Sequence, residues 1–150
     1  MIKDFVVLVN ENDEKIGLMP KMEAHEKGLL HRAFSVFIFN RNNELMLQRR
    51  SLKKYHSPGL WTNTCCSHPV KNLSLEESAQ SRLVVEMGIE AKLKKIFSFV
   101  YETEFENGLH EYEYDHVLFG KFNGIPKIKN VDPEVIPKWK NENNKSTTIK

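Results

Sequence analysis

The stretch Ser74–Gly88, SLEESAQSRLVVEMG, decides which part of the chain is helical. Ser74 and Glu77 have the spacing of a capping box, apolar residues recur at helical spacing, and the final glycine is the residue that most often follows a helix end. The stretch therefore predicts one amphipathic helix. Arg82 and Glu86, four residues apart, would share one of its faces, either as a solvated ion pair or as part of a site. The apolar stripe consists of Leu75, Ala79, Leu83 and either Met87 or Val84.

Most of the chain around this helix has the pattern of β-strands. Short apolar runs separated by polar turns predict two hairpins before the helix, with a short helix at Lys21–Lys27, and a third hairpin after it. This mixture predicts an α+β fold, in which helices flank a mixed β-sheet. The predicted strands are Phe5–Val9, Ile16–Met19, Ala33–Phe39, Glu44–Gln48, Ile96–Phe105 and Glu111–Phe122.

Length and composition indicate one soluble domain. The chain has 150 residues, 40% of them hydrophobic and 28% charged, which is enough for one core and too little for two. The formal net charge of +2 is too small to indicate a nucleic-acid partner, and no apolar run is long enough to cross a bilayer. We expect a domain over residues 1–138, a polar, disordered tail over residues 139–150, and a monomer by default.

The stretch Trp61–Pro69, WTNTCCSHP, places the only two cysteines of the chain side by side and close to a histidine. Adjacent cysteines cannot form a disulfide framework, and the N-terminus has no small-residue cleavage site, so we expect reduced thiols in the cytoplasm. In an extended segment Cys65 and Cys66 point to opposite sides, so one thiol can face a substrate while the other packs in the core. The basic stretch Arg49–Gly59, predicted as a loop, would bring positive charge beside them.

The predicted strand Glu111–Phe122 carries an acidic face. Residues two apart in a strand point to the same side, so Glu111, Glu113 and Asp115 share one face. That face is either exposed to solvent or buried with a cation or a shared proton. With three histidines, two of these carboxylates could form a site for a divalent first-row metal, although a single histidine is more often a surface or satisfied residue. The candidate ligands are His25, His31, His68, Glu111 and Glu113.

Four separated motifs resemble, in the same order, those of type I isopentenyl-diphosphate isomerases. They are KMEAHEKGLLHRAFS, LQRRSLKKYHSPGLWTNTCCSHP, RLVVEMGIE and HEYEYDH, and the resemblance runs from about Phe5 to Pro133. It implies the Nudix fold, an α/β/α sandwich of the α+β class. Of the usual Nudix helix pattern the chain keeps only Glu86 and Gly88, which argues against diphosphate hydrolysis.

The reaction that the resemblance implies is the interconversion of isopentenyl diphosphate and dimethylallyl diphosphate in isoprenoid biosynthesis, without a redox cofactor. A carbon-carbon double bond is a very weak base, so such an enzyme needs a placed acid, a base across the alkene plane and a pocket that excludes water. By matching position, Cys66 and Glu113 are the catalytic pair and Tyr101 the active-site tyrosine. We favour Glu113, with Tyr101, as the acid and Cys66 as the base, and the letters alone leave the reverse assignment open.

The same resemblance implies the ligands of two metal ions and of a small prenyl diphosphate, with no nucleic acid or membrane as partner. One metal site maps onto His25, His31, His68, Glu111 and Glu113, and its mixed ligands suit Mn²⁺, Zn²⁺ or Mg²⁺. Glu86 matches a ligand of a second ion, Mg²⁺, bridged by phosphate oxygens. Basic side chains would neutralise the diphosphate. These are Lys21, Arg50, Lys54 and Arg82.

The chain departs from the family pattern at its C-terminus. Members of the family continue through a further helical segment with a tryptophan that closes the pocket, and Ile136–Lys150 does not match that region, so Trp139 is not assigned this role. The chain therefore looks like a family member that lacks the C-terminal segment. Two alternatives to an active isomerase stay open: a catalytically weak or silent homologue that binds metal and prenyl diphosphate, and a Nudix-type diphosphate hydrolase.

Overall fold

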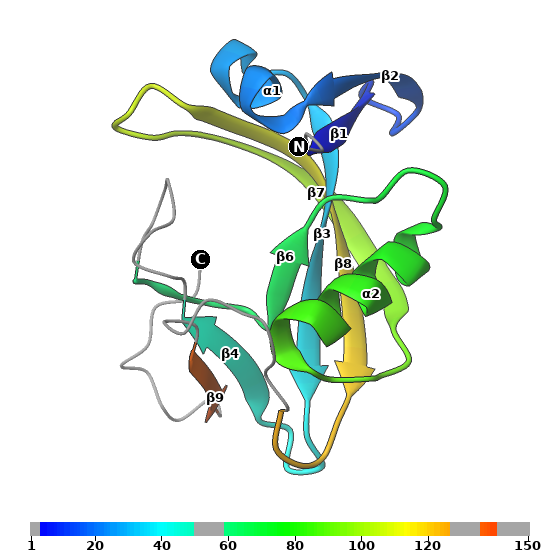
Figure 1. Cartoon of the computed structure of the whole chain (residues 1–150), viewed down its shortest axis with the longest axis vertical. Coiled ribbons are helices and arrows are strands. Elements are labelled where there is room, and N and C mark those ends of the chain that lie inside the picture. The colour runs from blue at the N-terminus through cyan, green and yellow to red at the C-terminus, as the bar shows by residue number, and fades with distance from the viewer. Residues whose placement is uncertain (1–3, 50–58, 127–135, 141–150) are drawn as a thin grey trace.

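The computed structural model describes residues 4–49, 59–126 and 136–140, which form two helices and a nine-stranded mixed sheet (Figure 1). The helices are α1 (Lys21–Lys27) and α2 (Leu75–Met87). The strands are β1 (Phe5–Val9), β2 (Lys15–Pro20), β3 (His31–Phe39), β4 (Leu45–Arg49), β5 (Trp61–Thr62), β6 (Cys65–Ser67), β7 (Lys94–Glu104), β8 (His110–Lys121) and β9 (Ile136–Lys140). The predicted α+β class is confirmed.

The sheet is organised around β3. This strand pairs in parallel with β8, from His31 opposite Glu113 to Phe39 opposite Lys121, and antiparallel with β1, β4 and β6. β8 pairs on its other side with β7, and the two form the long hairpin predicted after the helix (Figure 1). β1 and β2 form the first predicted hairpin. A single parallel pair among antiparallel ones makes the sheet mixed, as predicted.

Helix α2 forms where the sequence predicts it. The Ser74 hydroxyl accepts a hydrogen bond from the Glu77 backbone, the Glu77 carboxylate accepts one from the Ser74 backbone, and a left-handed Gly88 ends the helix. Leu83 and Met87 are fully buried against β3, whereas Val84 is 45% exposed, so Met87 completes the apolar stripe. Burying a side chain of this size stabilises the fold by about 1.5–3 kcal/mol.

The register of β3 separates the two faces of the sheet. Residues paired across the parallel strands point to the same side, so Val36 and Leu118 share the face against which α2 packs. His31 and Glu113 share the opposite face, where His25 of α1 joins them. The two helices therefore contact opposite faces of the sheet, which is the predicted α/β/α arrangement.

Some predictions lie partly or wholly outside the described residues. Residues 139 and 140, predicted as the start of the tail, belong to β9, which pairs antiparallel with β4. Residues 141–150 are outside the described part, so the domain boundary at residue 138 stays a prediction. Most of the predicted basic loop Arg49–Gly59 is also outside it. No helix in the described ranges is long and apolar enough to span a membrane.

Candidate functional site

A pocket of about 350 Å³ opens on the sheet face opposite the α2 core. The strands β3, β6, β7 and β8 and the edge of α2 all contribute side chains to it. Its wall combines a thiol, an imidazole and four carboxyl groups, a concentration of reactive groups that is typical of a functional site. These residues are Cys66, His68, Glu86, Glu111, Glu113 and Asp115.

Strand register brings the thiol and the central carboxyl to the same face. Cys66 is opposite Ser35, and Ser35 is opposite Val117 on β8, so these residues share one row. Glu113 lies on the same strand and face as Val117, four residues away, which is roughly 13 Å along the backbone. The Cys66 thiol and the Glu113 carboxyl therefore reach the same pocket from two different rows of the sheet.

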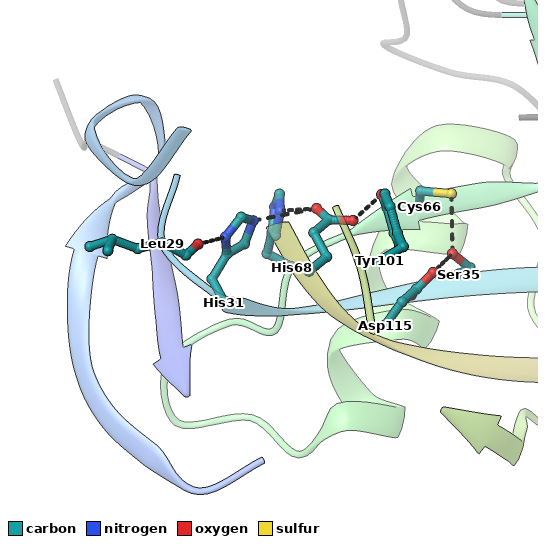
Figure 2. Close-up of polar contacts among 8 residues, drawn as sticks. Leu29, His31, Ser35, Cys66, His68, Tyr101 and Asp115 are labelled. Atoms are coloured by element: carbon teal, nitrogen blue, oxygen red, sulfur yellow. Dashed lines mark hydrogen bonds and ion pairs between the residues drawn. The ribbon is translucent and has the colours of Figure 1, made fainter. Parts of the chain in front are cut away.

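Three imidazoles and one carboxylate form a cluster, and two of its members, His68 and Glu113, line this pocket. One ligand atom from each of His25, His31, His68 and Glu113 lies within 4.8 Å of the others. Glu113 Oε2 is 3.2 Å from His68 Nε2 and 3.4 Å from His31 Nε2 (Figure 2). Because His31 Nδ1 donates to the Leu29 carbonyl at 2.9 Å, its Nε2 carries the lone pair that a metal would use.

The electrostatics of this cluster suit a divalent metal ion. Burial, with the neighbouring His31 as a second cause, lowers the pKa of His25 to about 4. Burial also lowers the pKa of His68, although the Glu113 carboxylate opposes that shift. Both rings are therefore neutral near pH 7, which is the form of imidazole that binds metals. Glu111, the fifth predicted ligand, lines the same pocket but is not part of this four-residue group.

Glu113 also contacts Tyr101, on the neighbouring strand β7. The Tyr101 hydroxyl donates a hydrogen bond to Glu113 Oε1. Burial alone would raise the pKa of Glu113, but the neighbouring His31 and His68 imidazoles and the Tyr101 hydroxyl outweigh it and hold the pKa well below its usual range. Burial and the Glu113 carboxylate raise the pKa of Tyr101, so the phenol keeps its proton.

The two neighbouring thiols have different environments. Cys65 is fully buried in the core beneath α2, and burial raises the pKa of its thiol. Cys66 points to the opposite side of β6, into the pocket, and its Sγ is 3.6 Å from Ser35 Oγ (Figure 2). The same sulfur is 3.0 Å from Asn63 Oδ1. The alternation of an extended strand predicted that one thiol would pack and the other would face a pocket.

The pair Arg82 and Glu86 is part of the pocket wall. Arg82 Nε donates to Glu86 Oε2, and Gln48 Nε2 of β4 donates to Glu86 Oε1 at 3.1 Å. The interpretation as a solvated ion pair is therefore only half right. The Arg82 side chain is partly exposed, whereas the Glu86 side chain is largely buried and contacts both Arg82 of α2 and Gln48 of β4. Lys21 also lines the pocket, whereas Arg50 and Lys54 lie outside the described residues.

The interpretation of Glu111, Glu113 and Asp115 as an exposed acidic face is wrong. Their exposed fractions are 4%, 6% and 4%, because β8 is a central strand whose acidic face forms the pocket wall. Tertiary pairing on both edges of β8 overrides the general rule that carboxylates lie outside.

Sequence reasoning did not find several residues that line the pocket. Ser35 Oγ donates to Asp115 Oδ2 at 2.7 Å and so joins β3 to β8 beside the thiol. The available signals were weak: Ser35 interrupts an apolar run, and Asp115 continues the acidic alternation. Other residues of this kind include Gln48, Asn63, Phe97 and Phe99.

Comparisons with known proteins show the family and the fold of this chain. Residues 29–141 match the NUDIX domain. An "Isopentenyl-diphosphate Delta-isomerase 2" from Aromatoleum aromaticum is 51% identical over 93% of this chain and 72% of its own length, and one of the same name from Photorhabdus laumondii is 49% identical over 92% and 77%. The crystal structure of DR0079 from Deinococcus radiodurans has a TM-score of 0.69 at 20% identity over 91% of this chain and 83% of that one, which shows a shared fold.

Proposed function

The chain belongs to the isopentenyl-diphosphate Delta-isomerase family of Nudix-domain proteins, and from this premise we propose that it interconverts isopentenyl diphosphate and dimethylallyl diphosphate. The observation that carries the proposal is that Cys66 and the buried Glu113 line one pocket from the same face of the sheet. A thiol and a carboxyl on either side of a flat alkene are the acid and base that an allylic proton shift requires.

The reaction moves one proton onto the substrate and one off it. The terminal alkene carbon gains a proton and becomes a methyl group, which leaves a tertiary carbocation. Loss of a proton from the neighbouring carbon on the diphosphate side then forms the new double bond, so that atoms and charge balance. We assign Glu113, with Tyr101, to the first transfer, for which the carboxylate first takes up a proton from water, and we assign Cys66, as its thiolate, to the second.

Contacts around Glu113 support its assignment. His68 and Tyr101 hold its two oxygens in place, so the carboxyl is positioned before the substrate binds. Tyr101 keeps its own proton and donates a hydrogen bond to Glu113, so the hydroxyl orients the carboxyl.

An aromatic row on the pocket side of β7 supports a cationic intermediate. The ring centroids of Phe97 and Phe99 are 6.1 Å apart, and those of Phe99 and Tyr101 are 5.8 Å apart. All three rings line the pocket. Aromatic faces attract a cation and bring no nucleophile that would quench it.

Divalent metal ions complete the proposed site. His25, His31, His68 and Glu113 would hold one ion, with Glu111 beside them, and Mn²⁺, Zn²⁺ and Mg²⁺ are the candidates. When bound, it would fix the Glu113 carboxyl and bias its proton affinity. Glu86 would hold a second ion, Mg²⁺, shared with the diphosphate. Lys21 and Arg82 line the pocket where the diphosphate would bind, and Arg50 and Lys54 stay predicted contacts.

The partner of this site is thus a small prenyl diphosphate. A monomeric state, a cytoplasmic location and the absence of nucleic-acid and membrane partners stay predictions from the sequence.

Incubation of the metal-loaded protein with isopentenyl diphosphate tests the proposal. We expect dimethylallyl diphosphate to form, and its formation to stop in Cys66→Ala and Glu113→Gln. Cys65→Ala, which alters the neighbouring thiol outside the pocket, should retain turnover. Tight binding of substrate without conversion, or release of phosphate in place of conversion, would overturn the assignment.

A further inference from the structure

The turn between β5 and β6 carries a buried amide beside the reactive thiol, and we infer that Asn63 is a positioning residue for Cys66. Its catalytic consequence rests on the proposed function, whereas the contact itself does not. Asn63 is 3% exposed and lines the pocket. A polar side chain this deeply buried is expected to have a partner at each of its polar atoms.

The backbone fixes the orientation of the Asn63 amide. Its Nδ2 donates to the carbonyl oxygens of Val36 and Cys65, each at 3.0 Å. Both partners are acceptors, so exchanging the oxygen and nitrogen would break two buried hydrogen bonds. The oxygen Oδ1 is therefore held on the side of the amide that faces the thiol.

This fixed oxygen contacts the sulfur directly. Asn63 Oδ1 is 3.0 Å from Cys66 Sγ and also accepts a hydrogen bond from Thr62 Oγ1 at 3.0 Å. A cysteine has a single side-chain torsion with three staggered positions, and the contact favours the one that brings Sγ to this oxygen. Ser35 Oγ lies at the longer distance of 3.6 Å from the same sulfur.

The protonated thiol makes this contact. In the proposed reaction Cys66 holds a proton at the end of the forward direction and at the start of the reverse direction, and in these two states Asn63 would hold the sulfur in place. Without Asn63 the sulfur could occupy other staggered positions. Because a misplacement of about 1 Å at a reacting group can cost roughly a hundredfold in rate, rotation of the thiol should lower kcat more than it changes KM.

Thr64 provides a matched control. Its hydroxyl makes two buried backbone contacts, accepting from Ile38 N at 3.0 Å and donating to the Met46 carbonyl at 2.6 Å. Thr64→Val therefore loses two backbone hydrogen bonds in the same turn, as Asn63→Ala does. Of Asn63 and Thr64, only Asn63 has a hydrogen bond to the Cys66 side chain. A purely structural role for the turn would affect both variants alike.

The S–H stretching band of Cys66 tests the contact without any turnover. The difference between infrared spectra of the wild-type protein and Cys66→Ala isolates this band. We expect a frequency below that of ethanethiol in an apolar solvent, an increase in Asn63→Ala, and no change in Thr64→Val. A wild-type band at the frequency of the free thiol would overturn the inference even if Asn63→Ala does not fold, and so would an unchanged band in a folded Asn63→Ala.

Kinetics test the consequence. Asn63→Ala should lower kcat by about 10- to 100-fold with KM within about twofold, while Thr64→Val retains kcat within about twofold. If the wild-type protein shows no conversion, the proposed function fails and the infrared band still decides the role of Asn63. If the wild-type protein turns over and Asn63→Ala is equally active, the positioning role is wrong.

Discussion

The hydrogen bond from Tyr101 to Glu113 predicts how Tyr101→Phe should behave. The change removes one hydroxyl from the pocket and leaves the ring beside Phe99. Glu113 is 6% exposed and ionised, and a hydrogen bond to a charged group contributes about 1.5–3 kcal/mol. Since about 1.4 kcal/mol corresponds to a tenfold change in rate, kcat should fall by about 10- to 100-fold.

The assay measures conversion of isopentenyl diphosphate together with the bound metal content. His25, His31 and His68 do not depend on the Tyr101 hydroxyl for their positions near Glu113, so the metal content should stay at the wild-type level. Tyr112→Phe is the matched control because Tyr112 lies on β8 with its side chain on the opposite face from Glu113. A folded, metal-loaded Tyr101→Phe with kcat within about twofold of wild type would refute the role of this hydrogen bond.

Three further predictions concern the metal cluster, the core and pH. His31→Ala should weaken binding of a divalent metal by at least about tenfold in calorimetry, whereas His110→Ala, outside the cluster, should not, and equal affinities would contradict the ligand assignment. Leu83→Ala should lower the free energy of unfolding by about 2–5 kcal/mol, while Val84→Ala, at a 45% exposed site, should change it by less than about 1 kcal/mol in urea titrations. Burial lowers the pKa of His116 below its ordinary 6.5, although Asp13 opposes that shift, so the unfolded chain binds a proton that the folded chain does not. The stability of the metal-free protein should therefore decrease as the pH falls below about 6.5, and His116→Gln should reduce this decrease.

The elements with strong local signals could be predicted from the sequence. The capping box of Ser74 and Glu77 and the stop at Gly88 define α2 without any tertiary information. The hairpins followed from polar turns between apolar runs, and their bounds differ from the prediction by one or two residues. The parallel pairing of β3 with β8 could not be predicted, because it joins segments about eighty residues apart.

In the candidate site, too, local sequence patterns could be predicted and long-range contacts could not. Alternation on β8 grouped Glu111, Glu113 and Asp115, but their burial depends on β3 and β7 pairing with both edges of that strand. Asn63 could not be recognised for a similar reason. It belongs to a turn with no regular pattern, and only the fold brings its amide to Val36.

The central claim is that Glu113 and Cys66, which line one pocket, transfer protons to and from the same substrate. A single isotope measurement tests this claim most directly. The metal-loaded protein is incubated with isopentenyl diphosphate in D₂O, and the product is examined by NMR and mass spectrometry. The account predicts dimethylallyl diphosphate with deuterium in the newly formed methyl group, and no such product from Cys66→Ala or Glu113→Gln. Product without deuterium, or labelled product formed at the wild-type rate by either variant, would contradict it.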